Sequence, residues 1–430
     1  MPDKLKIRTW NAKQLPPDWF KRAQTFDESV ENSTKAIISE VRKNGDVALV
    51  RFTEKFDKAR VKPENLRVPA EEIQAAYGRV TEDQINAIRL MKEKVGAYEQ
   101  ANLKQLETAT NQEGSTVQTM LFPIESVGCY VPGGQAAYPS TVVMTTTPAK
   151  ASGVPRIVVC SPPDKDGSLN PLVLVACDIC GVNEIYRVGG VQAVAALAYG
   201  TETIKPVCKI VGPGSKYVTM AKILVSRDVA IDMPAGPSEV LVLADDTANA
   251  EFVAADMISQ AEHGADSVAG LMTTSRQLAN KVTDSLARMA GSVERGEIVQ
   301  KALQTYGFII LCDNVDDMVR LANVFAPEHL EIMTRTPLEI AQRVTAGLIL
   351  IGPYSPVALS DYGAGTNHVL PTGGFTRAFS GLSALDFSRR VGVVDCSKEG
   401  LRGLRNHVKV MASAEDLPNH YRAVDVRFEA

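Results

Sequence analysis

Apolar side chains recur three or four positions apart in the first hundred residues, and this spacing is typical of helices. Between residues 27 and 45 the apolar positions follow one helical face, and Gly45 is expected to end the helix. Thr81 and Gln84 form the pattern of a capping box, and the apolar residues at 85, 88, 91, 95 and 98 then lie on one face. Residues 1–110 are therefore predicted to form a mainly helical N-terminal region.

From residue 127 onward, short β-rich runs alternate with helical stretches. Such alternation predicts parallel strands that are joined by crossover helices. The first series is SVGCYVP, RIVVCSPP, EIYRVGG, KIVGPG and VAIDMP, and after a turn at 234–237 the second is EVLVLAD, SVAGLMTT, FIILCD, HLEIMT and GLILIG. The pattern predicts an α/β fold with two units of similar size, which we assign to residues 111–235 and 236–380.

Residues 381–430 form a third kind of segment. They become helical again through Lys398–Ala414 and end in the strand-like run AVDVRFE. Because so short a segment cannot bury a core alone, we expect it to pack on another domain or on another subunit.

Composition excludes several classes of protein. Hydrophobic residues make up 45% of the 430 residues and charged residues 22%, which is an ordinary globular mixture. Lys and Arg number 46 against 50 for Asp and Glu, so no basic surplus favours nucleic acid. The N-terminus lacks the pattern of a signal peptide, and no apolar run approaches the ~18 residues of a membrane span. We therefore expect a cytoplasmic protein that does not enter a membrane.

The seven cysteines fit reduced thiols better than a disulfide framework. Cys177 and Cys180 form a CxxC pattern, but no second CxxC accompanies it. The surrounding segment, LVLVACDIC at 172–180, is apolar on all sides. Core packing is the favoured interpretation of this pair.

Glycines cluster where the predicted strands end, at positions 133 and 134, 189 and 190, and 212 and 214. Ligands bind at the carboxyl ends of strands in open parallel sheets, and glycine there lets the backbone approach a phosphate. The glycines thus indicate a nucleotide, although the fingerprint GxGxxG is absent. Tight strand-to-helix turns explain each glycine pair equally well.

Four of the five histidines lie in polar or turn-rich segments, namely QAEHG, PEHLE, GTNHVLP and LPNH. Histidines concentrated in such segments are more often functional than packed in a core. The fifth, His407, fits a helix surface, and we assign it no role. The segment GAGTNHVLPTGG that contains His368 is too polar for a strand and too long for a plain turn.

Gln260 and His263 lie three positions apart at the end of a predicted helix, before Gly264. Two donors at the negative end of a helix dipole favour a cation, and with Asp361 and His420 they would form a mixed nitrogen and oxygen site. Such a site suits substrate exchange. The alternative is a helix end whose polar residues face water.

Glu328 and His329 are adjacent in FAPEHLEI and would place two proton acceptors in one small volume. A reaction with more than one proton transfer needs such a pair. The alternative is an exposed polar turn. The motifs GxSxG, HExxH and GxxxxGK[ST] are absent.

The ordered motifs resemble the histidinol dehydrogenase family over nearly the whole chain. They are YVPGG, VGGVQAVAALAYGTE, KIVGPG, IDMPAGPSEVLV, SQAEHG, PEHL, SDYGAGTNHVLPTGG and AEDLPNH. The resemblance implies oxidation of L-histidinol through L-histidinaldehyde to L-histidine, with zinc and with two NAD reduced in succession. It also implies two incomplete Rossmann-like domains with small helical N- and C-terminal domains, in an intertwined homodimer whose C-terminal part completes the neighbouring active site.

The resemblance also implies roles for individual residues. The zinc ligands would be Gln260, His263, Asp361 and His420, the proton acceptors Glu328 and His329, and the further substrate contacts Ser238, His368 and Glu415. The NAD contacts would be Tyr130 and Gln192. Where the family usually has Asn after GPG, this chain has Ser215, which keeps a hydroxyl donor but reaches less far than the amide, so a water is expected to bridge to the dinucleotide.

Three other functions stay open at this stage. Related branches of the family oxidise other alcohols, although the SDYGAGTNHVLPT region follows the histidinol pattern. A zinc-dependent hydrolase with Glu328 as its base would explain the polar cluster but not the glycines at the strand ends. A catalytically silent metal-binding protein would need no paired base. Activity with and without NAD separates these functions.

Overall fold

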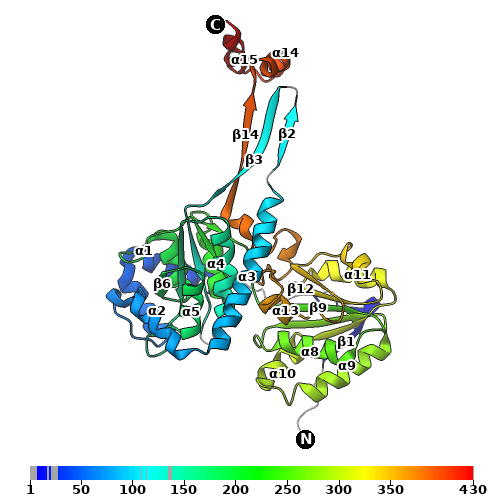
Figure 1. The fold of residues 1–430 in the computed structure, drawn as a ribbon. Helices are drawn as coiled ribbons and strands as arrows, with labels where there is room; N and C mark the ends of the chain where they lie inside the picture. Colours follow the sequence, from blue (N-terminus) through cyan, green and yellow to red (C-terminus); the bar gives the residue numbers. More distant parts are fainter. Residues whose placement is uncertain are drawn as a thin grey trace.

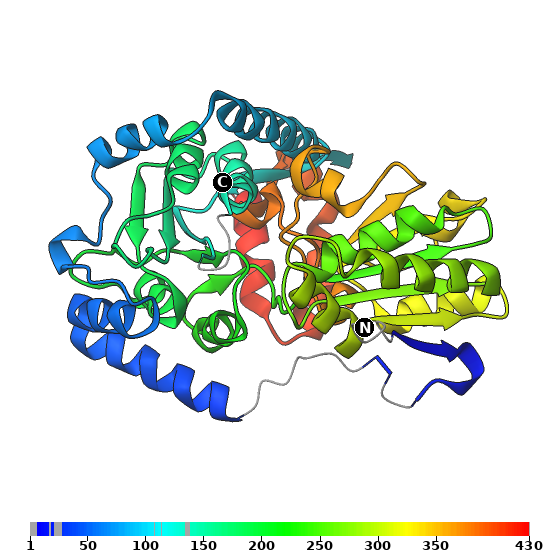
Figure 2. The same ribbon diagram turned by 90° about the horizontal axis from the view of Figure 1, so that it is seen from below.

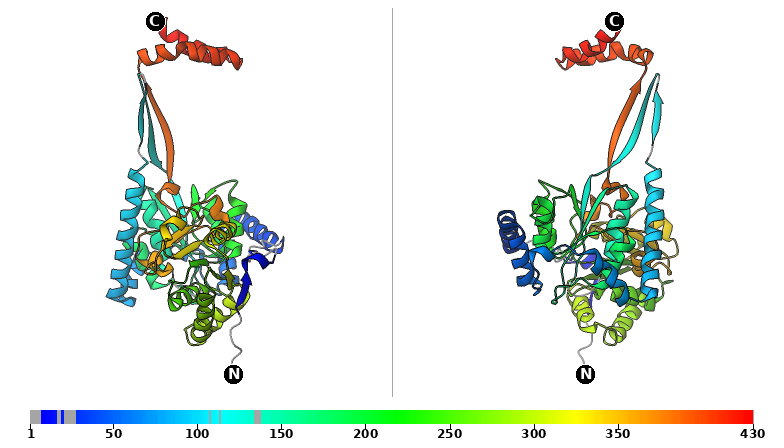
Figure 3. Two further views of the ribbon diagram at one scale, coloured as in Figure 1. Left: turned by 90° about the vertical axis from the view of Figure 1, so that its right-hand side faces the viewer. Right: turned by 60° about the vertical axis from the view of Figure 1, so that its left-hand side comes forward.

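The computed structural model describes residues 7–16, 19–20, 28–106, 108–112, 114–133 and 138–429. Two α/β lobes lie side by side, and a long antiparallel ribbon rises from them with two helices at its far end (Figure 1). Figure 2 shows the lobes from below, and Figure 3 shows how far the ribbon extends from both.

The first lobe contains a five-stranded parallel sheet in the order β6-β5-β4-β7-β8. Its side chains alternate between two buried layers, so Cys129 packs toward α4 and α5 while Tyr130 packs toward α1, α6 and α7. The strands are β4 (Ser126–Tyr130), β5 (Arg156–Ser161), β6 (Glu184–Arg187), β7 (Lys209–Val211) and β8 (Ala230–Ile231), and the helices between them are α4 (Pro139–Ala151), α5 (Pro171–Ile179), α6 (Gly190–Tyr199) and α7 (Lys216–Val225).

The second lobe contains a six-stranded parallel sheet in the order β1-β11-β10-β9-β12-β13. Its strands are β1 (Arg8–Asn11), β9 (Glu239–Ala244), β10 (Val268–Thr273), β11 (Phe308–Leu311), β12 (His329–Met333) and β13 (Leu348–Ile351). Its helices are α8 (Ala250–Ala261), α9 (Arg276–Met289), α10 (Gly296–Thr305), α11 (Val315–Phe325), α12 (Pro337–Ala341) and α13 (Val357–Tyr362).

Both lobes repeat one topology. Counted along the chain from β4 or from β9, five strands in each sheet have the order 3-2-1-4-5, and β1 adds an edge strand to the second sheet. This order is that of the doubly wound Rossmann fold without its sixth strand, and the strand order reverses beside the first strand. The predicted α/β fold with two Rossmann-like parallel sheets is confirmed.

Helices α1 (Glu28–Phe56), α2 (Ala70–Ala76) and α3 (Glu82–Lys104) follow in the N-terminal region, and the capping box at Thr81 and Gln84 is confirmed. One element of this region was not predicted. Residues 8–11 form strand β1, which pairs with β11. Gly45 ends the first part of α1 as predicted, because its φ of +49° and ψ of −132° are not helical. A second helical part begins after this kink, where the Asp46 N–H donates to the Glu202 carboxylate at 2.7 Å.

The ribbon and its terminal helices were only partly predicted. Strands β2 (Ala109–Gln112), β3 (Ser115–Pro123) and β14 (Ser388–Cys396) form an antiparallel sheet in the order β14-β3-β2, followed by α14 (Lys398–Ala414) and α15 (Pro418–Asp425). Helix α14 confirms the helical prediction, but the strand expected in AVDVRFE is wrong. That run completes α15 and a 3-10 turn, because no strand lies beside it and a helix satisfies its own backbone.

Short 3-10 helices lie at Ala12–Gln14, Pro63–Asn65, Tyr77–Arg79, Phe375–Arg377, Ala384–Phe387 and Val426–Phe428. Cys177 and Cys180 are both buried, so the core interpretation of this pair is confirmed. Within the part of the chain that the structure describes, no helix is both long enough and apolar enough to cross a membrane.

Candidate active site

Glu328 and His329 lie at the amino edge of the second sheet, where β12 begins beside β9. Only 6% of Glu328 and 4% of His329 are exposed, so the alternative of an exposed polar turn is wrong. From the sequence, ligands were expected at the carboxyl ends of the strands. In this lobe the buried acid and imidazole instead lie at the opposite edge, next to the position where the strand order reverses.

Backbone groups hold the Glu328 carboxylate in place. Its Oε2 accepts a hydrogen bond from the Glu239 N–H at 2.7 Å, while the Glu328 N–H donates to Glu239 Oε2 at 3.3 Å. Glu239 Oε1 accepts from the Gly373 N–H at 3.0 Å. Glu239 therefore joins β9, β12 and the loop after α13. The sequence analysis missed it, because its one signal is a carboxylate at the start of a buried strand.

The imidazole of His329 has one nitrogen engaged and one free. Nδ1 lies 3.2 Å from the carbonyl oxygen of Glu239 and 3.6 Å from Glu328 Oε2. A carbonyl oxygen only accepts, so Nδ1 carries a proton and Nε2 is left as an acceptor. Nε2 is buried and has no hydrogen-bond partner among the described residues. His329 thus offers a basic nitrogen to a ligand.

The surroundings adjust the affinity of His329 for a second proton. Burial disfavours the charged imidazolium, but the Glu328 carboxylate stabilises it, with further contributions from Asp361 and the Glu239 carbonyl. The net effect raises the pKa of His329 above its ordinary value of 6.5.

Two predicted residues, His263 and Asp361, lie near His329, and Gln260 lies beside His263 at the end of α8. Gln260, in the last turn of α8, is 1% exposed, and its Oε1 has no hydrogen-bond partner among the described residues. His263 is exposed just past the end of α8, and its backbone N–H donates to the Gln260 carbonyl at 3.3 Å. The charge of His263 contributes to the lowered pKa of Asp361, which lies on α13.

Asp361 is held ionised by histidines. Burial alone would raise the pKa of Asp361, but a hydrogen bond from His368 and the charges of His368, His329 and His263 lower it overall. His368 Nδ1 lies 3.6 Å from Asp361 Oδ1. The described residues contain no group of three or more His, Cys, Asp and Glu side chains that could hold a metal ion by themselves.

His420 and Glu415 lie far from these residues within one chain. Glu415 follows α14, His420 lies on α15, and both are exposed at the far end of the ribbon. The structure therefore divides the predicted site into a group on the second lobe and a pair at the end of the ribbon. Ser238 belongs to the first group, half-buried directly before β9, where its carbonyl accepts from the Val268 N–H at 3.0 Å.

A second polar edge lies on the first lobe, at the carboxyl ends of β4, β6 and β7. Tyr130 ends β4, and its hydroxyl accepts from the Gly190 N–H at 3.1 Å, where α6 begins. Gln192 on α6 is 1% exposed, and its amide oxygen and nitrogen both lack partners among the described residues. Gly212 has φ +116°, and a Cβ there would lie 2.2 Å from the Tyr130 carbonyl oxygen.

Ser215 follows this glycine as the residue before α7. It is exposed, and its side chain makes no capping hydrogen bond to the helix. This edge carries two helix N-termini beside the reversal point between β4 and β7, an arrangement that suits a phosphate group. Gly134 of the YVPGG motif lies outside the described residues.

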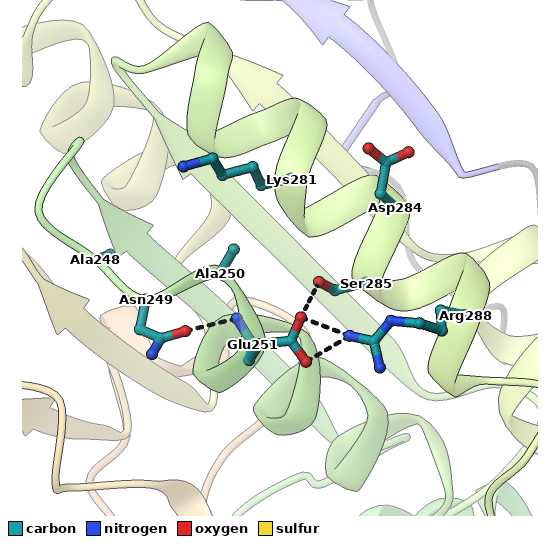
Figure 4. A pocket seen from close by; sticks show the side chains of 8 residues that line it. All are labelled: Ala248, Asn249, Ala250, Glu251, Lys281, Asp284, Ser285 and Arg288. Carbon is teal, nitrogen blue, oxygen red and sulfur yellow. Dashed lines mark hydrogen bonds and ion pairs between the residues drawn. The ribbon is translucent and has the colours of Figure 1, made fainter.

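One further cavity does not belong to either edge. It has a volume of about 630 Å³ and lies between the start of α8 and helix α9 (Figure 4). The Glu251 carboxylate there pairs with Arg288 at 2.5 Å and accepts from the Ser285 hydroxyl at 2.7 Å. None of its lining residues is a predicted site residue, and Gln260 lies at the opposite end of α8.

The fold and the two edges define an enzyme that is built from two doubly wound α/β lobes. The family model that matches residues 20–428 is described as histidinol dehydrogenase. The chain belongs to the histidinol dehydrogenase family, and it is therefore an oxidoreductase.

Curated relatives and a solved structure agree with this assignment. The chain is 45% identical to the histidinol dehydrogenase of Clostridium acetobutylicum, with 92% of each chain covered. It is 46% identical to that of Methanothermobacter thermautotrophicus, with 97% of each covered. A crystal structure of histidinol dehydrogenase from Elizabethkingia anophelis matches with a TM-score of 0.92 at 36% identity, and the match covers 98% of each chain.

Proposed function

We propose that this chain oxidises L-histidinol to L-histidine through L-histidinaldehyde, in the cytoplasm and as a homodimer, with two NAD reduced in succession. The observation that carries the proposal is the buried pair of Glu328 and His329, in which Nε2 of His329 has no partner among the described residues. The curated relatives support the same activity, since they are named histidinol dehydrogenase.

The two bases divide the proton transfers. Nε2 of His329 accepts the hydroxyl proton of histidinol while the carbon loses hydride, which leaves the aldehyde. Glu328 then accepts a proton from water as the water oxygen bonds to the aldehyde carbon. The hydrate anion formed in this way loses a second hydride to give the carboxylic acid, which then releases a proton as the carboxylate. Each hydride is accepted by a separate NAD when that cofactor is bound.

Residues for a zinc ion are present, although no single chain supplies all four. Gln260, His263 and Asp361 would come from one chain and His420 from a second copy. The unpartnered Oε1 of Gln260 and the ionised Asp361 fit a divalent cation. Zinc in this place would orient the substrate through its imidazole and amino groups. Ser238, His368 and Glu415 would add polar contacts to the substrate, and Glu415 would pair with its ammonium group.

The first lobe supplies residues that fit NAD. The unpartnered amide of Gln192, the hydroxyl of Tyr130 and the close backbone approach at Gly212 leave donors and space at the edge between β4 and β7. The exposed Ser215 keeps a hydroxyl donor but has less reach than the Asn usual in the family. We infer a weaker or water-bridged contact at that position.

Exposed apolar side chains on the ribbon and its terminal helices support the homodimer. They include Val394 on β14, Val410 on α14 and Leu417 before α15. Ala412 and Gly400 are the buried residues of α14, and no residue of α15 is classed as buried. Elements that bury so little in one chain gain stability by packing against a second copy.

The test is the absorbance of NADH when zinc-loaded protein is mixed with L-histidinol and excess NAD. We expect two NADH per histidinol, with the activity lost on chelation and in Gln260→Ala. One NADH would show that the aldehyde is released. No NADH with zinc confirmed bound would contradict the proposal and favour another alcohol, or a hydrolase if turnover needs no NAD.

The dependence of the rate on pH tests the role of His329. Because a base must be neutral, activity is expected to rise as the pH passes the pKa of His329, which lies above 6.5. Glu328→Gln removes the carboxylate that stabilises the imidazolium, so the rise should move to lower pH. The measurement is kcat/KM for the first NADH against pH. An unmoved profile would show that Glu328 does not act on His329.

A further inference from the structure

Two buried carboxyl groups lie behind the candidate site, and the proposed chemistry does not use them. Asp256 on α8 is 9% exposed and Glu331 on β12 is 1% exposed. Their side chains hydrogen-bond to each other. Two carboxyl groups in an apolar layer are expensive to desolvate, and apolar side chains would pack there at lower cost. The pair therefore calls for an explanation in terms of function.

The pKa values of both carboxyl groups lie above the ordinary range. Glu331 Oε2 is buried, and no N–H or O–H group of the described residues donates to it. Burial raises the pKa of Asp256 to about 6, and burial together with the charge of Asp256 raises the pKa of Glu331 well above its ordinary value.

Each carboxyl group lies on the same element and face as a site residue. Asp256 precedes Gln260 by four positions on α8, which is about one helical turn. Glu331 follows His329 by two positions on β12, so both side chains point to the face of the sheet that α8 covers. The pair thus links the helix of a proposed metal ligand to the strand of a proposed base.

Glu331 also joins a third element. Its Oε1 accepts a hydrogen bond at 2.9 Å from the N–H of Val357, the first residue of α13. Asp361, another proposed ligand, lies four positions further along this helix. Because α13 has only six residues, this bond at its first residue also restrains the position of Asp361. One buried pair therefore connects α8, β12 and α13.

We propose that Asp256 and Glu331 are positioning residues, a buried carboxyl pair that sets Gln260 and Asp361 at the spacing needed by a divalent metal ion and keeps His329 in register with them. The inference rests on the proposed function and deepens it. Neither residue touches substrate or metal, and both act through the elements that they join. Outer partners of this kind commonly change metal affinity by about 10–100-fold.

The test compares Glu331→Leu with Glu331→Gln. Leucine removes both hydrogen bonds, whereas glutamine keeps an oxygen for the Val357 N–H and an amide donor for Asp256. Zinc affinity is measured on metal-stripped protein by competition with a chromogenic chelator. Glu331→Leu is expected to lower zinc affinity about 10–100-fold and to raise KM for histidinol. Glu331→Gln should restore zinc affinity to within about threefold of wild type.

Asp46→Leu is the matched control, because Asp46 is also a buried carboxyl group but lies on α1 at the first lobe. It should lower the melting temperature and leave zinc affinity unchanged. If Glu331→Leu does not fold, the same comparison is made at Asp256, with Asp256→Ala in place of Glu331→Leu and Asp256→Asn in place of Glu331→Gln.

The proposal is overturned if a folded leucine or alanine variant binds zinc as tightly as wild type, or if Glu331→Gln is as defective as Glu331→Leu. Wild-type protein that binds zinc but does not oxidise histidinol would contradict the proposed function only, since the affinities of the variants would still decide the role of the pair. Wild-type protein that binds no zinc would contradict both.

Discussion

A His420→Ala chain and a Gln260→Ala chain should each be inactive alone, and a reassorted equal mixture of the two should recover about a quarter of wild-type activity. Each variant removes one proposed zinc ligand. Because loss of outer partners alone costs about 10–100-fold, loss of a ligand should reduce kcat/KM by at least about 100-fold.

The recovery follows from the position of the two residues. Gln260 is buried in the second lobe, whereas His420 is exposed at the far end of the ribbon. If the end of one ribbon completes the site of the other chain, a mixed dimer has one site with both ligands intact and one with neither. Half of the dimers in an equal mixture are mixed, so about one site in four is intact.

A mixture of Gln260→Ala with Asp361→Ala is the control for this experiment. Both residues lie on the second lobe, so no mixed dimer of these variants contains an intact site, and no recovery is expected. His407→Ala, an exposed histidine of α14 without a proposed role, should be active alone. No recovery in the test mixture would show that each site is completed within one chain. Recovery in the control mixture would show that Gln260 and Asp361 reach one site from different chains.

Elements with a clear local pattern of apolar residues could be predicted from the sequence, whereas elements that depend on pairing with distant residues could not. Strand β9 is buried along its whole length, so its run of apolar residues was sufficient to identify it. Strands β3 and β14 are partly exposed on both sides, and each pairs with a partner more than 260 residues away. Their local patterns did not identify them, and no strand was predicted at 115–123 or at 388–396.

The candidate site shows the same distinction. Glu328 and His329 were selected because an adjacent acid and imidazole are visible in the sequence. Glu239, Asp256 and Glu331 were missed, because each is a single charge within an apolar element and acquires its role only from neighbours across the sheet. A charge at an inward position of a buried strand was the one available signal.

Lys222→Met should lower the free energy of unfolding by about 3–5 kcal/mol, which is a large part of the stability of an ordinary domain. Lys222 on α7 and Asp232 form an ion pair, and their side chains are 3% and 0% exposed. The Lys222 ammonium also donates to the Gly212 carbonyl at 2.9 Å, and Asp232 Oδ2 accepts from the Gly212 N–H at 2.8 Å. Methionine would leave the Asp232 carboxylate buried without its cation.

The same change should weaken the binding of NAD, because the ion pair fixes both backbone groups of Gly212 in the loop that approaches Tyr130. We expect KM for NAD to rise while KM for histidinol stays near wild type, and urea unfolding to report the loss of stability. Lys301→Met, at an exposed lysine of α10 on the second lobe, is the control and should change neither quantity.

The double variant Lys222→Met with Asp232→Asn separates a buried unpaired charge from a simple loss of packing. It removes both charges but keeps an oxygen that can accept from the Gly212 N–H. Because the unpaired carboxylate is the main cost in the single variant, the double variant should be more stable than Lys222→Met alone. If it is equally unstable or less stable, the stability of this loop depends on the contacts of the lysine side chain and not on neutralisation of Asp232.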